Sequence, residues 1–186
     1  MKKRLISAAI LAASLVTTAN AADYVVDDKG AHAAINFKVS HLGYSWLTGR
    51  FNVFDGKFSY DEKNVAASKI TVNIDPNSID SNHAERDKHL RSDDFLDVSK
   101  FKTAKFESTK IVDKGNGKLA ITGDFTMHGI TKSIMIDAEK IGAGDDPWGG
   151  YRAGFSGTTK IAMKDFGFKM DFGEVLLDLH IEGIRQ

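Results

Sequence analysis

The sequence predicts an all-β domain, folded as an antiparallel barrel or a sandwich, with one short helix. Three observations lead to this prediction. Apolar and polar residues alternate with a period of two over most of the chain, which is typical of strands with one buried and one solvated face. Turn-like, glycine-containing segments separate the alternating stretches. No helical pattern recurs between them, as a parallel α/β sheet would require.

The alternating stretches predict eight or nine strands along the chain. In the first stretch, Ile35, Phe37 and Val39 share one face. In the second, the alternation shifts between Val53 and Phe58, which predicts a bulge or a tight turn at Asp55-Gly56. Short connections of hairpin composition are expected at residues 114–117 and 128–130. The clearest stretches cover residues 32–40, 50–60, 68–75, 118–127, 131–140, 151–163 and 174–184.

Residues 81–97 (SNHAERDKHLRSDDFLD) interrupt this alternation. Asn82 followed by Glu85 has the spacing of a capping box, so a short helix is expected from about His83 to Ser92. The helix is too polar to belong to the core. We expect it to lie across one end of the β-structure, held there by the apolar pair Phe95-Leu96.

A metal site or a catalytic site is a second interpretation of this helix. His83 with Asp87, or His89 with Asp93, would place two ligands one helical turn apart. Two ligands do not complete a site, and the same residues make ordinary ion pairs on a solvated helix. The chain has no cysteine and no G-x-S-x-G motif, so thiol chemistry is excluded and a serine nucleophile has no recognisable motif. We expect no cofactor and no bound metal.

The N-terminal segment predicts export. Residues 1–21 combine a basic start, an apolar run and the small residues ANA, so they are expected to be a secretory signal peptide cleaved near Ala21. The expected mature domain, residues 22–186, would be periplasmic in a host with two membranes. Removing Lys2, Lys3 and Arg4 from the 25 basic residues leaves 22 against 25 acidic ones, a formal charge of −3. This charge argues against nucleic acid as a partner.

The outward faces of the predicted strands decide against an outer-membrane barrel. Such a barrel carries an apolar outer surface with aromatic girdles. Here the second face of the strands presents charged residues, among them Lys38, Asp124 and Glu182. The apolar face must therefore point inward.

Several segments, in order, resemble the YceI-like family of polyisoprenoid-binding periplasmic proteins. They are HLGYSWLTGRFNVFDGKF, SIDSNHAERDKHLRSDDFLD, FESTKI, ITGDFTMHGITKSI and KDFGF. The resemblance implies an eight-stranded antiparallel lipocalin-like barrel with the short helix across a barrel mouth. It also implies a ligand, either an isoprenoid or another long-chain lipid such as a fatty-acyl or amide lipid, no enzymatic activity, and a homodimer in some members. Lys102 and Ser133 stand where the family usually has proline, which puts only local geometry in doubt.

The inward apolar residues have two possible roles. From the residues alone a closed core is favoured, because every barrel needs one, and it would leave a protein-interaction module with a filled barrel. The family resemblance instead favours a lumen that holds hydrocarbon. A metal-assisted periplasmic enzyme using His83, Asp87 or His89 is the remaining alternative. The expected lumen residues are Ile35, Phe37, Phe51, Val53, Phe58, Phe106, Ile121, Phe125, Met127, Ile134, Ile136, Phe155, Ile161 and Leu177.

Two segments are expected at the barrel mouth. Arg86, His89 and Arg91 on the helix could meet a polar or phosphorylated headgroup, because the arginine fork suits phosphate oxygens. The alternative is that Arg91 and Asp87 only pin the helix to the barrel. His41 and Trp46, in another segment without alternation, are the second mouth candidates.

Overall fold

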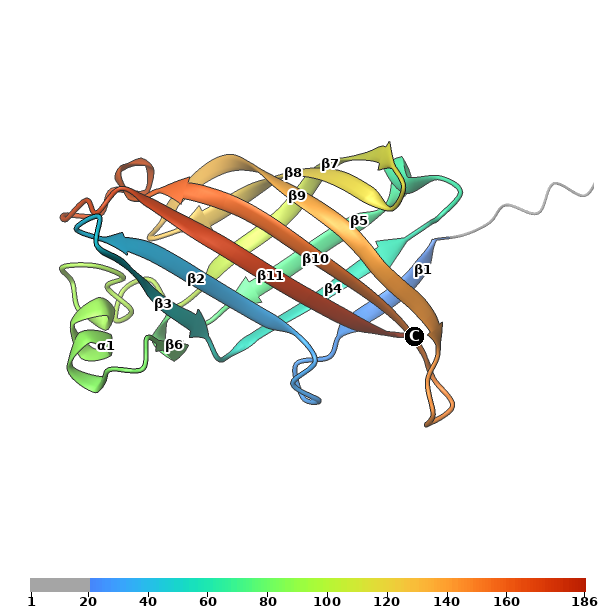
Figure 1. The fold of residues 1–186 in the computed structure, drawn as a ribbon, viewed down its shortest axis with the longest axis horizontal. Coiled ribbons are helices and arrows are strands. Elements are labelled where there is room, and N and C mark those ends of the chain that lie inside the picture. The colour runs from blue at the N-terminus through green and yellow to red at the C-terminus, as the bar shows by residue number, and fades with distance from the viewer. Residues whose placement is uncertain (1–20) are drawn as a thin grey trace, which may run out of the picture.

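The computed structural model describes residues 21–186, so nearly all of the expected signal peptide lies outside the described residues. The described chain forms one closed antiparallel barrel (Figure 1). Its strands are β1 (Ala22–Val26), β2 (Ala34–His41), β3 (Ser45–Phe51), β4 (Phe54–Tyr60), β5 (Lys69–Ile74), β6 (Ile79–Asp80), β7 (Ala104–Gly115), β8 (Lys118–Met127), β9 (Ile130–Asp145), β10 (Tyr151–Ala162) and β11 (Glu174–Arg185). Three short 3₁₀ helices, η1 (Val65–Ala67), η2 (Pro76–Ser78) and η3 (Met163–Phe166), and one α-helix, α1 (Ala84–Arg91), connect them.

These eleven segments occupy eight positions around the barrel, which confirms the predicted eight-stranded architecture. Five positions are the long strands β7 to β11. The other three positions each contain two segments in line. β1 and β2 share the first, because both pair with β11. β4 and β3 share the second, since β4 pairs with β1 and β3 with β2, and β5 and β6 share the third, since β5 pairs with β4 and β6 with β3. Pairing of β1 with β11 closes the ring.

Tight turns explain how the long strands follow one another. Asn116-Gly117 and His128-Gly129 all have positive φ (54° and 78°, 52° and 75°), as a type I′ hairpin turn requires. They join β7 to β8 and β8 to β9; the β8–β9 pair keeps a continuous register, whereas the β7–β8 pair shifts register between Ser108 and Lys110 and between Asp113 and Gly115. Both hairpins expected from the sequence are therefore present.

The predicted irregularity near Asp55-Gly56 lies elsewhere. Both residues belong to β4, and the chain bends at residues 52–53, between β3 and β4. Hydrogen bonds from Val53 N to Ser78 Oγ (2.9 Å) and from Asp75 N to Val53 O (2.9 Å) tie this bend to η2. The bend turns Val53 outward, where 57% of it is exposed. The expectation that Val53 lines the lumen is therefore wrong.

Aromatic residues pack the interior at the β1 end of the barrel. Tyr24 stacks on Phe58 with ring centroids 4.7 Å apart, and Phe155 meets Phe58 edge-on at 5.6 Å. Tyr60 also packs edge-on against Phe155 at 5.1 Å. Edge-to-face and offset pairs of this kind stabilise a core beyond the area they bury.

The helix lies at the opposite end of the barrel, beside β3 and β6 (Figure 1). His83 rather than Asn82 caps it, since His83 Nδ1 accepts a hydrogen bond from Arg86 N (3.2 Å). Asn82 itself adopts a left-handed φ of 61°. The residues Phe95 and Leu96 are buried, as expected for the anchor of this segment. No helix within residues 21–186 has the length and apolar character needed to span a membrane.

Candidate functional site

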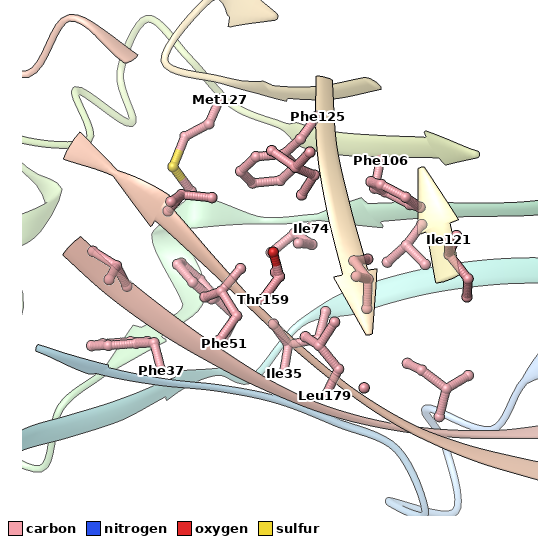
Figure 2. A pocket seen from close by; sticks show the side chains of 18 of the residues that line it. Ile35, Phe37, Phe51, Ile74, Phe106, Ile121, Phe125, Met127, Thr159 and Leu179 are labelled. Atoms are coloured by element: carbon pink, nitrogen blue, oxygen red, sulfur yellow. The ribbon is translucent and has the colours of Figure 1, made fainter. Parts of the chain in front are cut away.

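A cavity of about 540 Å³ occupies the barrel interior. Figure 2 shows side chains from opposite walls pointing toward this one space, among them Phe37, Phe106 and Leu179. The volume lies within the range of roughly 300–1,000 Å³ typical of small-molecule sites. The barrel is therefore not filled by its own side chains.

The exposure of inward residues supports the same conclusion. Ile121, Leu177 and Leu179 lie on the inward face of their strands and line the cavity, yet they remain partly exposed. In a barrel packed to the usual interior density they would be buried. Their residual exposed surface faces the cavity.

Almost all of the sequence-predicted lumen residues line this cavity; Val53 is the exception. Sequence reasoning did not assign three further lining residues, Phe168, Met170 and Phe172. They alternate between Gly167 and Gly173, both of which have positive φ. This flanked alternation was a usable signal, but the segment is too short to distinguish from a loop. The predicted residues that do line the cavity are Ile35, Phe37, Phe51, Phe58, Phe106, Ile121, Phe125, Met127, Ile134, Ile136, Phe155, Ile161 and Leu177.

The cavity wall offers hydrocarbon and few polar atoms. Thr159 Oγ1 donates to Met135 O (2.7 Å), so that hydroxyl hydrogen is already used. Tyr60 borders the cavity, and burial raises the pKa of its hydroxyl. Among the described residues no buried side-chain nitrogen or oxygen lacks a partner. A guest in this interior would have to be apolar, because no buried polar group in the wall awaits one.

The cavity reaches the surface at the α1 end, where exposed residues join its lining. The segment from Gly167 to Gly173 crosses from η3 to β11 there. Phe172 stacks on Phe95 with centroids 5.9 Å apart, and Lys169 Nζ lies 3.1 Å from Asp93 Oδ2. These two contacts hold the segment against the residues that follow α1.

Both helix arginines donate hydrogen bonds to the chain segment that precedes the helix. Arg86 donates from Nε to Ser81 Oγ (2.7 Å) and from Nη2 to Ser81 O (2.6 Å). Arg91 donates to Asn77 O and Ile79 O, both at 2.7 Å. These four bonds pin α1 to the chain before it. For Arg91 this is the alternative to headgroup binding stated from the sequence.

The expected mouth residues separate into two groups. Arg86, His89 and His41 line the cavity, whereas Arg91 and Trp46 do not. Trp46 lies on the outer side of β3, because its neighbour Leu47 lines the cavity and strand side chains alternate. The outer position explains why Trp46 contacts Lys38 instead (5.1 Å from Nζ to the ring).

The alternative metal ligands do not converge. Asp87 is buried and accepts hydrogen bonds from Ser81 N (2.9 Å) and from the Ser81 hydroxyl, while His83 caps the helix. His89 instead faces Asp94, with Nε2 3.2 Å from Oδ2.

Within residues 21–186, three potential metal ligands do meet at the barrel seam: Asp27, His32 and Glu182. The Arg152 guanidinium already lies between them, with Nη1 2.6 Å from both Asp27 Oδ2 and Glu182 Oε1. The hydrogen bond from Arg152, and to a smaller extent that from His32, lowers the pKa of Asp27 to about 2. The arrangement is a partly buried ion pair that fastens the end of β1 to β10 and β11, with its cationic position taken by arginine.

Comparison with known proteins gives consistent results. The family model described as the YceI-like domain matches residues 24–182. A UPF0312 protein of Shewanella denitrificans is 62% identical over 192 residues, covering 100% of both chains. The crystal structure of the Campylobacter jejuni YCEI protein shares 29% identity and a TM-score of 0.71, covering 80% of this chain and 91% of that one. A polyisoprenoid binding domain from Saccharophagus degradans shares the fold at 14% identity, with a TM-score of 0.64 over 89% of this chain and 99% of that one.

Proposed function

The chain belongs to the YceI-like family, and from this membership we propose that it is a binding protein holding one long apolar chain inside its barrel. The ligand would be a polyisoprenoid or a fatty-acyl or amide lipid. The observation that carries the proposal is the cavity of about 540 Å³ with an almost wholly apolar wall. The polyisoprenoid binding domain of Saccharophagus degradans, which has the same fold, supports the choice of ligand class.

Hydrocarbon burial supplies the binding energy. Each methylene group moved from water into the cavity contributes about 0.8 kcal/mol, so ten of them contribute about 8 kcal/mol before association costs. Isoleucine, leucine and phenylalanine form most of the wall and offer no hydrogen bonds. Such a wall selects a ligand by length and width. It would also reject a ligand with a polar group in the middle of its chain, because that group would be buried without a hydrogen-bond partner.

The polar end of the ligand would remain at the mouth. Arg86, His89 and His41 border the cavity there. Arg86 is held in place by its two bonds to Ser81, so it offers a cation that is already ordered. A headgroup at this position would keep its contact with water while the chain is buried.

We further propose that the protein acts in the periplasm as a carrier. This proposal rests on the expected signal peptide at residues 1–21 and on the size of the cavity, which suits one chain. A protein that encloses hydrocarbon allows a lipid to cross an aqueous space without exposing its apolar surface.

The test compares two tryptophan substitutions on adjacent residues of β11. Leu179 lines the cavity, whereas His180 lies on the outer face with 48% of its side chain exposed. Native mass spectrometry of purified wild-type protein should show one bound lipid, and added polyprenyl lipid should load any empty fraction. Leu179→Trp should lower occupancy at least about tenfold by filling the cavity. His180→Trp should bind as the wild type does. A wild-type protein that neither carries nor takes up a lipid, or a Leu179→Trp variant that binds normally, would overturn the proposal.

A further inference from the structure

The hairpin of β2 and β3 exposes large apolar side chains that its own fold does not need. Tyr44 is 88% exposed, Leu42 75% and Trp46 55%. Leu42 and Gly43 form the turn with positive φ, and a Cβ atom at Gly43 would have no neighbour within 4 Å. Clustered apolar residues of this kind at the tip of a structure mark an interaction surface.

The charges on the same hairpin are of one sign. From Ala34 to Phe51 the hairpin contains Lys38, His41 and Arg50 but no aspartate or glutamate. Among residues 21–186, no carboxylate lies within ion-pair distance of Lys38, whose Nζ lies 5.1 Å from the Trp46 ring. Aromatic and aliphatic side chains accompanied by cations, without acids, suit the headgroup region of an anionic lipid surface.

The hairpin is at the end of the barrel where the cavity opens. Figure 1 places the β2–β3 turn and the chain between η3 and β11 at the α1 end. In that chain Met170 and Phe172 are 42% and 51% exposed and also line the cavity. Apolar surface is therefore exposed on both the hairpin and the rim of the opening.

We infer that this end of the barrel docks on an anionic phospholipid bilayer through the β2–β3 hairpin, with the cavity mouth facing the membrane. The inference rests on the proposed lipid-binding function. Tyr44, Leu42 and Trp46 enter the headgroup boundary, and Lys38 meets lipid phosphates. The ligand then passes between bilayer and cavity along an apolar path, because Met170 and Phe172 lie at the rim.

The opposite end of the barrel supplies a matched control. The β9–β10 hairpin there exposes Trp148 (75%) and Ile141 (69%), but it carries the acidic pair Asp145-Asp146. It has comparable apolar exposure, but the cation beside its tryptophan, Arg152 (5.3 Å from the Trp148 ring), is already paired with Asp146 at 2.9 Å. An anionic surface should therefore distinguish the two hairpins.

The two tryptophans of the chain make this distinction measurable. Trp148→Phe leaves Trp46 as the reporter, and Trp46→Phe leaves Trp148. Vesicles of phosphatidylglycerol and phosphatidylcholine in equal amounts should shift the emission of Trp46 to shorter wavelength and leave that of Trp148 unchanged. Raised salt should weaken the effect, since it screens exposed charges.

Flotation with the same vesicles tests the residues themselves. Replacing Leu42, Tyr44 and Trp46 together by serine should lower the partition coefficient at least about tenfold. Replacing Ile141 and Trp148 by serine should leave it unchanged. Native mass spectrometry should still find lipid in both variants, because neither substitution touches the cavity wall.

Three results would overturn the inference. They are absence of vesicle binding by the wild type, equal binding of both serine variants, and equal binding to pure phosphatidylcholine vesicles. A change in sedimentation mass in the hairpin variant, without a change in vesicle binding, would instead identify a contact between copies of the chain. If any of these results appears while lipid is found inside the wild-type barrel, the proposed function still stands. Conversely, a barrel that is empty but still binds vesicles would refute only the proposed function.

Discussion

Replacement of Asp27 by asparagine tests the ion pair that fastens the barrel seam. Asp27 directly follows β1, and its backbone N–H donates to Glu182 O (2.8 Å) on β11. Its carboxylate accepts from Arg152 Nη1 (2.6 Å) and from Gly30 N (2.8 Å). The side chain is 6% exposed, so these contacts are largely shielded from water.

The lowered pKa sets the expected size of the effect. The pKa of Asp27 falls from 3.8 to about 2, and one pKa unit corresponds to about 1.36 kcal/mol. Arg152 is partly solvated, which reduces the free energy calculated from this pKa difference. We therefore expect the ionised carboxylate to stabilise the fold by about 2 kcal/mol at neutral pH. Because the folded-state pKa is depressed, this stability is present above pH 3.8 and is lost as the pH falls toward 2.

Urea unfolding at several pH values measures this contribution. Asp27→Asn should lower the free energy of unfolding by about 2 kcal/mol at pH 7, and the deficit should shrink as the pH falls from about 4 to about 2. Asp178→Asn is the control, since Asp178 is 56% exposed and its carboxylate lies 3.2 Å from the exposed His180; it should change stability by less than about 0.5 kcal/mol. A deficit in Asp27→Asn that is independent of pH would refute the electrostatic explanation.

Three further substitutions test the core, a close backbone approach and the helix anchor. Phe166→Ala should destabilise the fold by about 3–5 kcal/mol in urea unfolding, because Phe166 is 1% exposed and packs on Phe125; a smaller loss would mean that the site collapses. Gly123→Ala should lower the melting temperature by several degrees, because a Cβ atom there would lie 2.4 Å from Phe106 Cζ; an unchanged melting temperature would contradict this contact. Arg91→Ala should speed amide hydrogen exchange in α1 while leaving the mass of bound lipid unchanged, since Arg91 bonds only backbone carbonyls. Loss of lipid with unchanged exchange would indicate headgroup binding instead.

Local patterns in the sequence predicted most of the strands and the direction of their faces. Ile35, Phe37 and Ile121 point inward because alternation follows directly from the geometry of an extended backbone. The short strand β1 had no comparable signal, since its five residues ADYVV do not alternate clearly. Its role in closing the barrel comes from pairing with β11, which is distant in sequence.

In the charged segment, residues 81–97, local sequence again determined the element, and tertiary contacts determined its details. The helix and its approximate bounds follow from residues 81–97, but the cap is His83 rather than Asn82. The capping-box pattern failed because Asn82 takes a left-handed backbone conformation next to the end of β6. The bonds of Arg91 to Asn77 and Ile79 depend on how β6 and α1 meet, which composition alone does not determine.

The sequence by itself determined an all-β chain with an apolar inner face, a charged outer face and one polar helix, because these features depend on neighbouring residues along the backbone. Only the tertiary structure decided that the inner face surrounds a cavity instead of a filled core. The same isoleucines and phenylalanines could meet across a narrower barrel; the distance between opposite walls depends on strand number, tilt and register around the whole ring. The position of the β2–β3 hairpin beside the cavity mouth follows from that closed ring as well.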